Sequence, residues 1–218
     1  MSIKAKFVTT AALTAAITTG LAAPAIAAPA HPAAAAPASA GTASTNTAST
    51  GTASTGTVTE EQWLTDVSTA IAPARAYVEQ RTAQPTDQHL AIVFDIDNTT
   101  LATHFHPFTM PGIAPVVQLA QYAHSRGVAL IFVTARLDFI DPITRHSLAE
   151  AGYTVDELRG RDVSDLFEPV QQFKTNQRIK VENEGYTIIA NIGNNWTDIN
   201  GGHAEQTFKL PDYNGLLS

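Results

Sequence analysis

The sequence predicts an α/β fold of three layers, in which a Rossmann-like parallel sheet is covered by helices on both faces. Three apolar runs rich in β-branched residues, at 90–95, 128–136 and 186–192, have the composition of buried strands. Segments with helical spacing alternate with them along the chain, as in parallel α/β sheets. Polar residues end or directly follow each run. A ligand site is therefore expected beyond the carboxyl ends of the strands.

Composition and charge allow one folded domain. The chain has 218 residues, of which 44% are hydrophobic, and it contains no cysteine. Its formal net charge of -7 argues against binding of nucleic acid or of an anionic membrane surface, because both need clustered basic residues. The lack of cysteine excludes disulfides, thiol catalysis and thiolate metal sites.

The first residues have the layout of a secretory signal peptide. A short basic start with Lys4 and Lys6 precedes an apolar stretch over 7–26, and a small-x-small pattern ends at Ala27. The alternative is a membrane anchor, but threonine, glycine and proline interrupt the stretch, and alanine is only weakly lipophilic. We expect residues 1–27 to be a cleaved signal peptide, which leaves the mature protein without a membrane segment.

Residues 28–58 are expected to form a disordered linker. They consist almost entirely of Ala, Pro, Thr, Ser and Gly and include a repeat that begins with Gly41-Thr-Ala-Ser-Thr. Such a composition cannot bury enough apolar surface to fold. The folded domain is expected over 59–218. Together these segments predict a secreted protein, extracellular or associated with the cell wall.

The expected elements of the domain alternate in type. A capping-box pattern, Thr59-Glu-Glu-Gln62, opens the first helix. Glycines end several others, which is typical of helix C-termini. The expected helices are 59–81, 113–125, 142–151 and 169–184, and the expected strands are 90–95, 128–136, 153–159, 186–192 and 207–210.

Asp95 and Asp97 follow the first apolar run. Side chains at i and i+2 of an extended backbone point to the same side, so both carboxylates are expected to face one site. Two close like charges need a cation, a proton or hydrogen-bond donors, which indicates a metal site or acid/base chemistry. The alternative is a strand followed by an Asx turn, with Asp97 or Asn98 capping the next segment.

Four further polar residues are expected near this pair. Thr134, Asn194 and Asp198 follow other strands, and Lys174 lies on the helix before the third apolar run. Hydrolysis of a phosphomonoester needs a nucleophile, a proton donor and positive charge around the phosphoryl oxygens. Asp95 can attack phosphorus, and Asp97 can act as acid and then base. Lys174 and Thr134 can hold the phosphoryl group. A Mg²⁺ ion would offset the aspartates, and the oxygen donors favour it over Zn²⁺.

The motifs resemble those of the haloacid dehalogenase (HAD) superfamily. These are Asp95-Ile-Asp97-Asn-Thr, the strand-ending Thr134, Lys174 in its helix, and Gly193-Asn-Asn-Trp-Thr-Asp198, in that order. The last motif and the late Phe208-Lys-Leu-Pro are most similar to class III (subfamily IIIB) acid phosphatases, which include secreted members. The similarity covers about 60–212, and four ordered motifs are more specific than one.

The resemblance implies an aspartyl-phosphate on Asp95, acid/base catalysis by Asp97, and phosphate binding by Thr134 and Lys174. It also implies a Mg²⁺ site made by Asp95, the backbone carbonyl of Asp97, and the last motif with Asn194 and Asp198. An aspartate at position 97 favours phosphatase or phosphotransferase chemistry within the superfamily. The short segment between Asp97 and Thr134 leaves room for a minimal cap only, which suits varied small phosphomonoester substrates.

One residue departs from the family pattern. Asn194 stands where the family usually has an acid, so the metal site loses a negative charge unless Asp198 enters it. Asp198 can equally hold a metal-bound water or Lys174. The leading hypothesis is a secreted, Mg²⁺-dependent acid phosphatase. The alternatives are a catalytically impaired binding or cell-surface protein, which Asn194 favours, and a phosphotransferase.

Three other polar residues are weaker candidates. His104 and His106 follow the aspartate motif in a loop, where they can lie beside substrate or bind a second metal, although such a pair more often does neither. Arg136 either neutralises charge at the site or pairs with Asp138 or Asp141.

Overall fold

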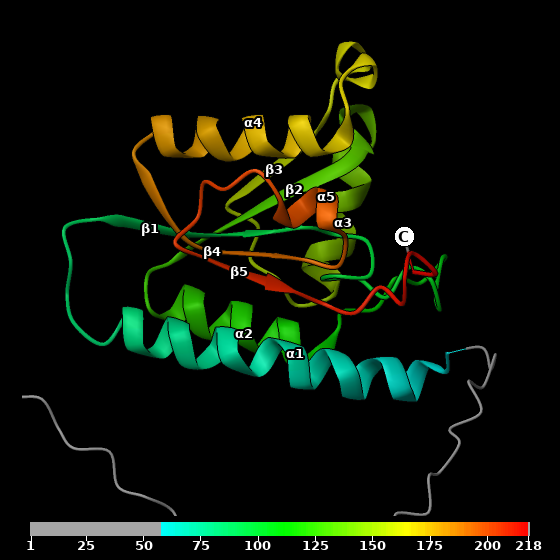
Figure 1. The fold of residues 1–218 in the computed structure, drawn as a ribbon, viewed down its shortest axis with the longest axis horizontal. Helices are drawn as coiled ribbons and strands as arrows, with labels where there is room; N and C mark the ends of the chain where they lie inside the picture. The colour runs from blue at the N-terminus through cyan, green and yellow to red at the C-terminus, as the bar shows by residue number, and fades with distance from the viewer. Residues whose placement is uncertain (1–57, 218) are drawn as a thin grey trace, which may run out of the picture. The chain divides into compact units, whose positions relative to one another are not determined.

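The computed structural model describes residues 58–217 (Figure 1). The predicted signal peptide, and all of the predicted linker except Val58, lie outside the described residues. Among the helices that are described, none combines the length and the apolar character that a membrane crossing would need.

The centre of the fold is a five-stranded, all-parallel sheet with the order β3-β2-β1-β4-β5. This confirms the predicted α/β fold with a parallel sheet. The strands are β1 His89–Phe94, β2 Ala129–Leu137, β3 Glu157–Arg161, β4 Tyr186–Gly193 and β5 Gln206–Lys209.

The helices connect successive strands, as parallel pairing requires, except for the first helix, which precedes β1. They are α1 Glu60–Arg81, α2 Ala114–Ser125, α3 Asp141–Glu150, α4 Val170–Asn183 and the short α5 Trp196–Ile199, with 3-10 turns η1 Asp138–Ile140 and η2 Val163–Phe167. At the start of α1, the Thr59 hydroxyl accepts from the Gln62 amide at 3.2 Å, which is one half of the predicted capping box.

Two differences from the expected elements have physical causes. β3 begins at Glu157 rather than at 153, because this edge strand pairs only with β2 and its ladder starts opposite Ile131. Tyr153, the expected start of this strand, is buried but lies before the ladder. α5 was not expected, since four residues are too few to show helical periodicity.

Alternate residues of the central strands enter two different cores. Leu90, Ile92 and Phe94 of β1 pack in the larger core with α1 and α2, whereas Ala91 and Val93 face α4. Figure 1 shows α1 and α2 below the sheet and α4 above it. This period-2 alternation places helices against both faces of the sheet and so produces the three predicted layers.

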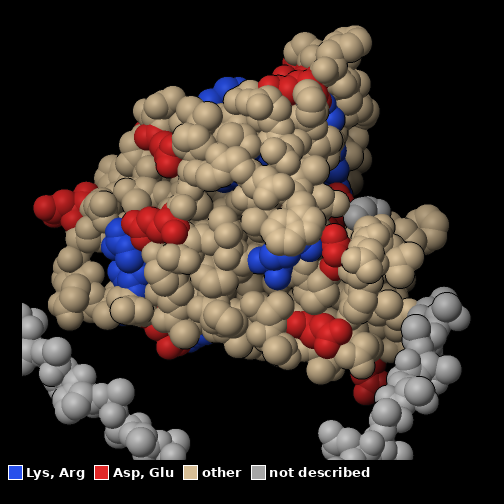
Figure 2. All heavy atoms as spheres, viewed as in Figure 1, with Lys and Arg blue, Asp and Glu red and all other residues tan. Residues whose placement is uncertain are grey.

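Charged side chains are mixed on the surface. On the face drawn in Figure 2, Lys and Arg lie in small groups beside Asp and Glu. Arg81 forms an ion pair with Glu205, with Nε 2.9 Å from Oε2, and the Tyr77 hydroxyl also donates to Glu205 at 2.6 Å.

Phe132 tests the larger core. Its ring stacks on Phe94 with centroids 5.7 Å apart and meets Tyr153 edge-on at the same distance, and it is fully buried. We expect Phe132→Ala to lower the free energy of unfolding by about 3–5 kcal/mol, because it removes apolar burial and leaves a cavity. Phe167→Ala is the control, since Phe167 is 93% exposed. Urea unfolding of both variants measures the difference, and equal losses would contradict this packing.

Candidate active site

The register of the sheet places the end of β1 beside the middle of β2 and the last residues of β4. Phe94 of β1 pairs with Phe132 of β2 and with Ile192 of β4. The amide of Asp95 donates to the Ile192 carbonyl at 2.9 Å, so Asp95 is the first residue beyond this level. A pocket of about 570 Å³ opens there, and its lining includes Asp95, Asp97, Lys174, Asn194, Asp198 and Leu217.

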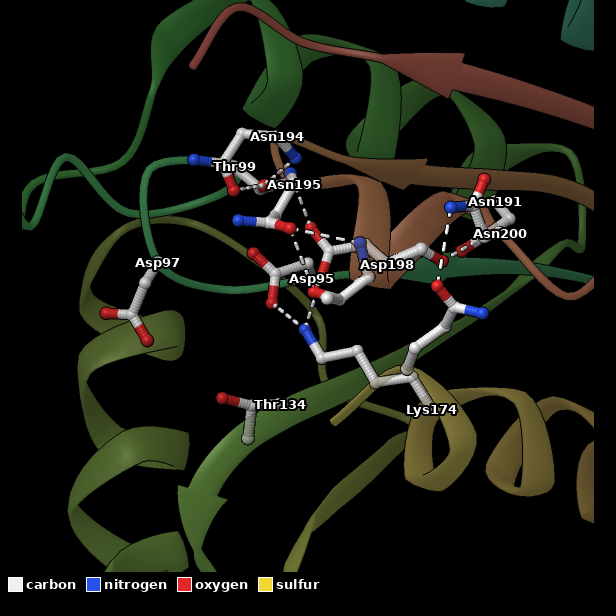
Figure 3. Close-up of polar contacts among 12 residues, drawn as sticks. Asp95, Asp97, Thr99, Thr134, Lys174, Asn191, Asn194, Asn195, Asp198 and Asn200 are labelled. Carbon is white, nitrogen blue, oxygen red and sulfur yellow. Dashed lines mark hydrogen bonds and ion pairs between the residues drawn. The ribbon is translucent and has the colours of Figure 1, made fainter. Parts of the chain in front are cut away.

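Lys174 is the centre of the polar contacts in this pocket (Figure 3). It lies on α4, and its Nζ is 2.6 Å from Oδ1 of Asp95 and 2.6 Å from Oδ1 of Asp198. All three residues are buried. The structure therefore joins the first strand end, the lysine helix and the last motif through one ammonium group.

Burial and the charges of this cluster shift the pKa values of Asp95 and Lys174. Burial and the negative charge of Asp198 raise the pKa of Asp95 to about 7, against the opposing effect of Lys174. Burial alone would lower the pKa of Lys174, but the two carboxylates outweigh it and raise that pKa. One ammonium between two carboxylates leaves one excess negative charge, which a proton or a cation can offset.

Asp198 is held by hydrogen bonds to its carboxylate and to its main-chain carbonyl. Its Oδ2 accepts from the Asn195 amide at 2.8 Å, which closes a capping box on α5. Its carbonyl accepts from Asn191 Nδ2 and Arg178 Nη1, both at 2.8 Å. Because both carboxylate oxygens bond to protein groups, Asp198 is placed to orient Lys174.

Gly193 makes room for this arrangement. A Cβ at position 193 would lie 2.3 Å from the Cβ of Asp198 and 2.6 Å from its Oδ2, which is closer than atoms can approach. The end of β4 can therefore pass beside Asp198 only with glycine at this position.

Asp97 lines the pocket but bonds to a different cation. Arg136, just after the predicted phosphate-binding Thr134, holds it with two parallel bonds, Nε to Oδ2 at 3.0 Å and Nη2 to Oδ1 at 2.6 Å. Of the two alternatives for Arg136, the structure supports neutralisation of charge at the site, because its partner is Asp97 and not Asp138 or Asp141. The Asp97 side chain is 45% exposed, which leaves it accessible from the pocket.

Thr134 lies on β2, two residues beyond the level of Phe94, and is not among the residues that line the pocket. It is fully buried, and its Oγ1 accepts from the Arg136 amide at 3.2 Å. Figure 3 shows the side chain on β2, separate from the bonded cluster around Lys174. Ala135, the next residue, lines the pocket.

Asn194 is bonded on both sides of its amide. Its backbone amide donates to Oγ1 of Thr99 at 2.9 Å, and that hydroxyl donates to Oδ1 of Asn194 at 3.2 Å. Nδ2 donates to the Leu217 carbonyl at 3.0 Å. The side chain thus connects the last motif to the first motif and to the C-terminal segment.

The oxygen donors at the site fit a hard divalent cation in kind. Within residues 58–217, no three His, Asp or Glu side chains are arranged to hold a metal ion. The carboxylate of Asp95 and the amide oxygen of Asn194 both line the pocket, and a main-chain oxygen such as that of Asp97 is the same kind of donor. Asp198 is already bonded to Lys174 and Asn195. The site therefore offers fewer ionised ligands than a metal site that contains two or three free carboxylates.

Several residues with structural roles at the site were not expected from the sequence. Asn191 is a polar residue inside an apolar strand, and Arg178 lies four residues after Lys174 on the same helix face. A polar residue within an apolar strand, and a second basic residue one helical turn after Lys174, could both have been recognised in the sequence. The contacts of Thr99 and Leu217 depend on the fold and carry no such signal. Of the two loop histidines, His104 lines the pocket, whereas His106 pairs with Glu60 at 2.8 Å.

Comparison with known proteins gives the family. A family model for the HAD superfamily, subfamily IIIB (acid phosphatase), matches residues 108–216. The chain belongs to this acid phosphatase family. The part that matches subfamily IIIB contains Thr134, Lys174, Asn194 and Asp198, and the two aspartates of the first motif precede it.

The relatives of this subfamily IIIB chain include two soybean proteins. The stem 28 kDa glycoprotein of Glycine max is 30% identical over 177 residues, covering 70% of this chain and 68% of that protein. A stem 31 kDa glycoprotein is also 30% identical over 177 residues, covering 70% and 60%. Among solved structures, the class C acid phosphatase of Bacillus anthracis has a TM-score of 0.53 at 15% identity, covering 66% of this chain and 67% of that one. At that identity the likeness shows the fold alone.

The raised pKa of Asp95 predicts a pH-dependent stability. Folded protein holds this proton up to about pH 7, whereas an unfolded carboxyl releases it near its ordinary value of 3.8. Between these values the unfolded chain binds fewer protons, so the free energy of unfolding should fall as pH rises. Urea unfolding in chelator from pH 4 to 8 measures this fall. It should be smaller in Asp95→Asn and unchanged in the exposed control Asp87→Asn; equal slopes in all three would contradict the shift.

Gly193→Ala tests the close approach of Asp198. The new methyl group should push α5 away and separate Asp198 from Lys174, lowering the free energy of unfolding by about 1–3 kcal/mol. Thermal unfolding measures the loss. A wild-type melting temperature would show that the site does not require glycine here.

Proposed function

We propose that this protein is a secreted, Mg²⁺-dependent acid phosphatase that hydrolyses phosphate monoesters through an aspartyl-phosphate on Asp95. The observation that carries the proposal is the buried contact of Lys174 with Asp95 at the carboxyl edge of the sheet, inside an open pocket. Membership of the acid phosphatase family supports it.

Lys174 is suited to receive a phosphoryl group beside Asp95. An ammonium has three N–H donors, and Asp95 and Asp198 use two of them. The third can bond to a phosphoryl oxygen. The lysine binds Oδ1 of Asp95, which leaves Oδ2 for attack on phosphorus. Thr134, on the neighbouring strand, is the proposed second phosphate ligand, through its hydroxyl hydrogen.

The reaction then has two balanced steps. Oδ2 of Asp95 bonds to phosphorus while the bond from phosphorus to the ester oxygen breaks, and Asp97 gives that oxygen a proton. A water molecule next attacks phosphorus, Asp97 takes its proton, and the bond between phosphorus and Asp95 breaks to release inorganic phosphate. The exposure of Asp97 suits this role, because its carboxyl must reach both the leaving group and water.

The proposed Mg²⁺ ligands are Asp95, the main-chain oxygen of Asp97 and the amide oxygen of Asn194. Asp198 would lie beside these ligands, connected to Asp95 by Lys174. When bound, the ion would supply positive charge that stabilises the phosphoryl oxygens and the ionised form of Asp95. A second structure of the Bacillus anthracis class C acid phosphatase, with a TM-score of 0.53 and 16% identity, covering 66% of this chain and 67% of that one, has tungstate bound. Tungstate is an oxyanion, and its presence in that structure supports the proposal that this protein binds a phosphate oxyanion.

The substrate range and location follow from the same features. The chain between Asp97 and Thr134 forms one loop and α2, so the pocket is open to varied small monoesters. Export by residues 1–27 and tethering by 28–58 would place the domain 59–218 outside the cell or at its wall.

A catalytically impaired binding protein is the second candidate. Asn194 favours it, because an amide replaces the usual acid and is already bonded to Thr99 and Leu217. A phosphotransferase would differ only in using an alcohol in place of water in the second step.

The test is hydrolysis of an aryl phosphate by the full chain, with and without Mg²⁺, from acid to neutral pH. We expect metal-dependent turnover that Asp95→Asn lowers by at least about 1000-fold, because the nucleophile is lost. Asp87→Asn removes an exposed carboxylate that precedes β1, at the opposite end of this strand from Asp95, and does not line the pocket, so it should retain wild-type turnover. Turnover that survives in Asp95→Asn would refute the mechanism, and none from folded protein with any divalent metal would favour the binding protein.

A further inference from the structure

One main-chain oxygen near the end of the described chain connects both loops of the site. The carbonyl of Leu217 accepts from Nδ2 of Asn98 at 2.7 Å and from Nδ2 of Asn194 at 3.0 Å. Asn98 belongs to the first motif, and Asn194 belongs to the last motif. Leu217 is buried and also lines the pocket.

This contact fixes which way the two amides point. A carbonyl oxygen can only accept, so the nitrogen of each asparagine must face Leu217 and the oxygen must face away. Oδ1 of Asn194 therefore points to Thr99, at 3.2 Å. Oδ1 of Asn98 accepts from the His104 amide at 2.8 Å and from the Thr103 hydroxyl at 3.3 Å, which closes the loop after the first motif.

The segment that presents this carbonyl is anchored independently of the site. The Tyr213 hydroxyl donates to Asp66 of α1 at 2.6 Å, and Lys209 lies 3.3 Å from Asp212. The Leu217 amide donates to the Asp212 carbonyl at 3.2 Å, and its side chain packs in the larger core. The carbonyl is thus held in place from α1 and from the core, not only by the asparagines.

We propose that the Leu217 carbonyl is a positioning group of the site, which orients the Asn194 amide so that its oxygen is presented to a divalent cation. This consequence for the metal rests on the proposed function. An aspartate at position 194 has no donor for Leu217, and its carboxylate would repel the carbonyl oxygen. The replacement of the family's usual acid by Asn194 therefore matches the presence of this acceptor, and need not reflect loss of the metal site.

Asn98→Asp in the full chain tests the proposal. Aspartate keeps the Oδ1 acceptor for His104 and Thr103 and tolerates the left-handed backbone of residue 98, where φ is 54°, but it loses the donor to Leu217. Asn183→Asp is the control, because it makes the same charge change at an exposed position at the end of α4. Two quantities are measured: amide hydrogen exchange at Leu216 and Leu217 in chelator, and affinity for Mn²⁺ by electron paramagnetic resonance.

In Asn98→Asp a carboxylate would face the Leu217 carbonyl oxygen and repel it, so the carbonyl should move although α1 and the core still anchor the segment. We expect exchange at Leu216 and Leu217 to accelerate at least about tenfold, and Mn²⁺ affinity to fall about 10- to 100-fold, as when an outer-shell partner of a metal ligand is lost. The direction is decisive, because the added negative charge alone would tighten Mn²⁺ binding. Asn183→Asp should change neither quantity.

Unchanged exchange in Asn98→Asp would overturn the proposal, and so would unchanged or tighter Mn²⁺ binding. If Asn98→Asp does not fold, Asn194→Asp gives the same exchange test, since it also lacks the donor. If the unaltered protein binds no Mn²⁺, the proposed metal dependence fails, and the positioning role fails with it. Mn²⁺ binding that Asn98→Asp does not weaken would overturn the positioning role alone.

Discussion

The buried ammonium of Lys174 between Asp95 and Asp198 is the constraint on which the site depends. A charge removed from water is tolerated only when it is paired, and loss of one partner from a buried pair costs about 3–5 kcal/mol. Lys174 comes from α4, Asp95 follows β1 and Asp198 lies in α5. The pairing therefore fixes three separate elements relative to each other. Gly193 and Arg178 serve the same contact, the first by giving Asp198 space and the second by holding its carbonyl.

This arrangement separates the two aspartates of the first motif in a way that suits different roles. Asp95 is buried, and its position is set by the end of β1 and by its bond to Lys174. Asp97 is half-exposed and bonded to Arg136, at the mouth of the pocket. A nucleophile benefits from a fixed position, whereas a group that exchanges protons with a leaving group and with water needs access. The Leu217 carbonyl adds a third fixed point, through the amides of Asn98 and Asn194.

Much of the fold could be predicted from the sequence, because the apolar runs of β1, β2 and β4 are long and the polar residues follow them directly. The central helices α1, α2 and α4 were placed to within one or two residues for the same reason. β3 was misplaced, since an edge strand has one partner and its start is set by that partner's register. At the site, Lys174 was predicted from its helix, but its joint contact with Asp95 and Asp198 depends on tertiary packing. For Arg136 the sequence left two alternatives open, and it could not identify the partner, because Asp97 lies 39 residues away. No pattern in the sequence indicates that residue 217 meets residues 98 and 194.

The central claim is that Asp95 becomes covalently phosphorylated during turnover. The most direct measurement is mass spectrometry of the protein quenched in acid while it hydrolyses an aryl phosphate, followed by peptide analysis under acidic conditions that preserve acyl phosphates. The account predicts a phosphoryl group on Asp95 that disappears as substrate is exhausted. Active protein in which Asp95 carries no phosphoryl group at any time, or in which another residue carries it, would contradict the account.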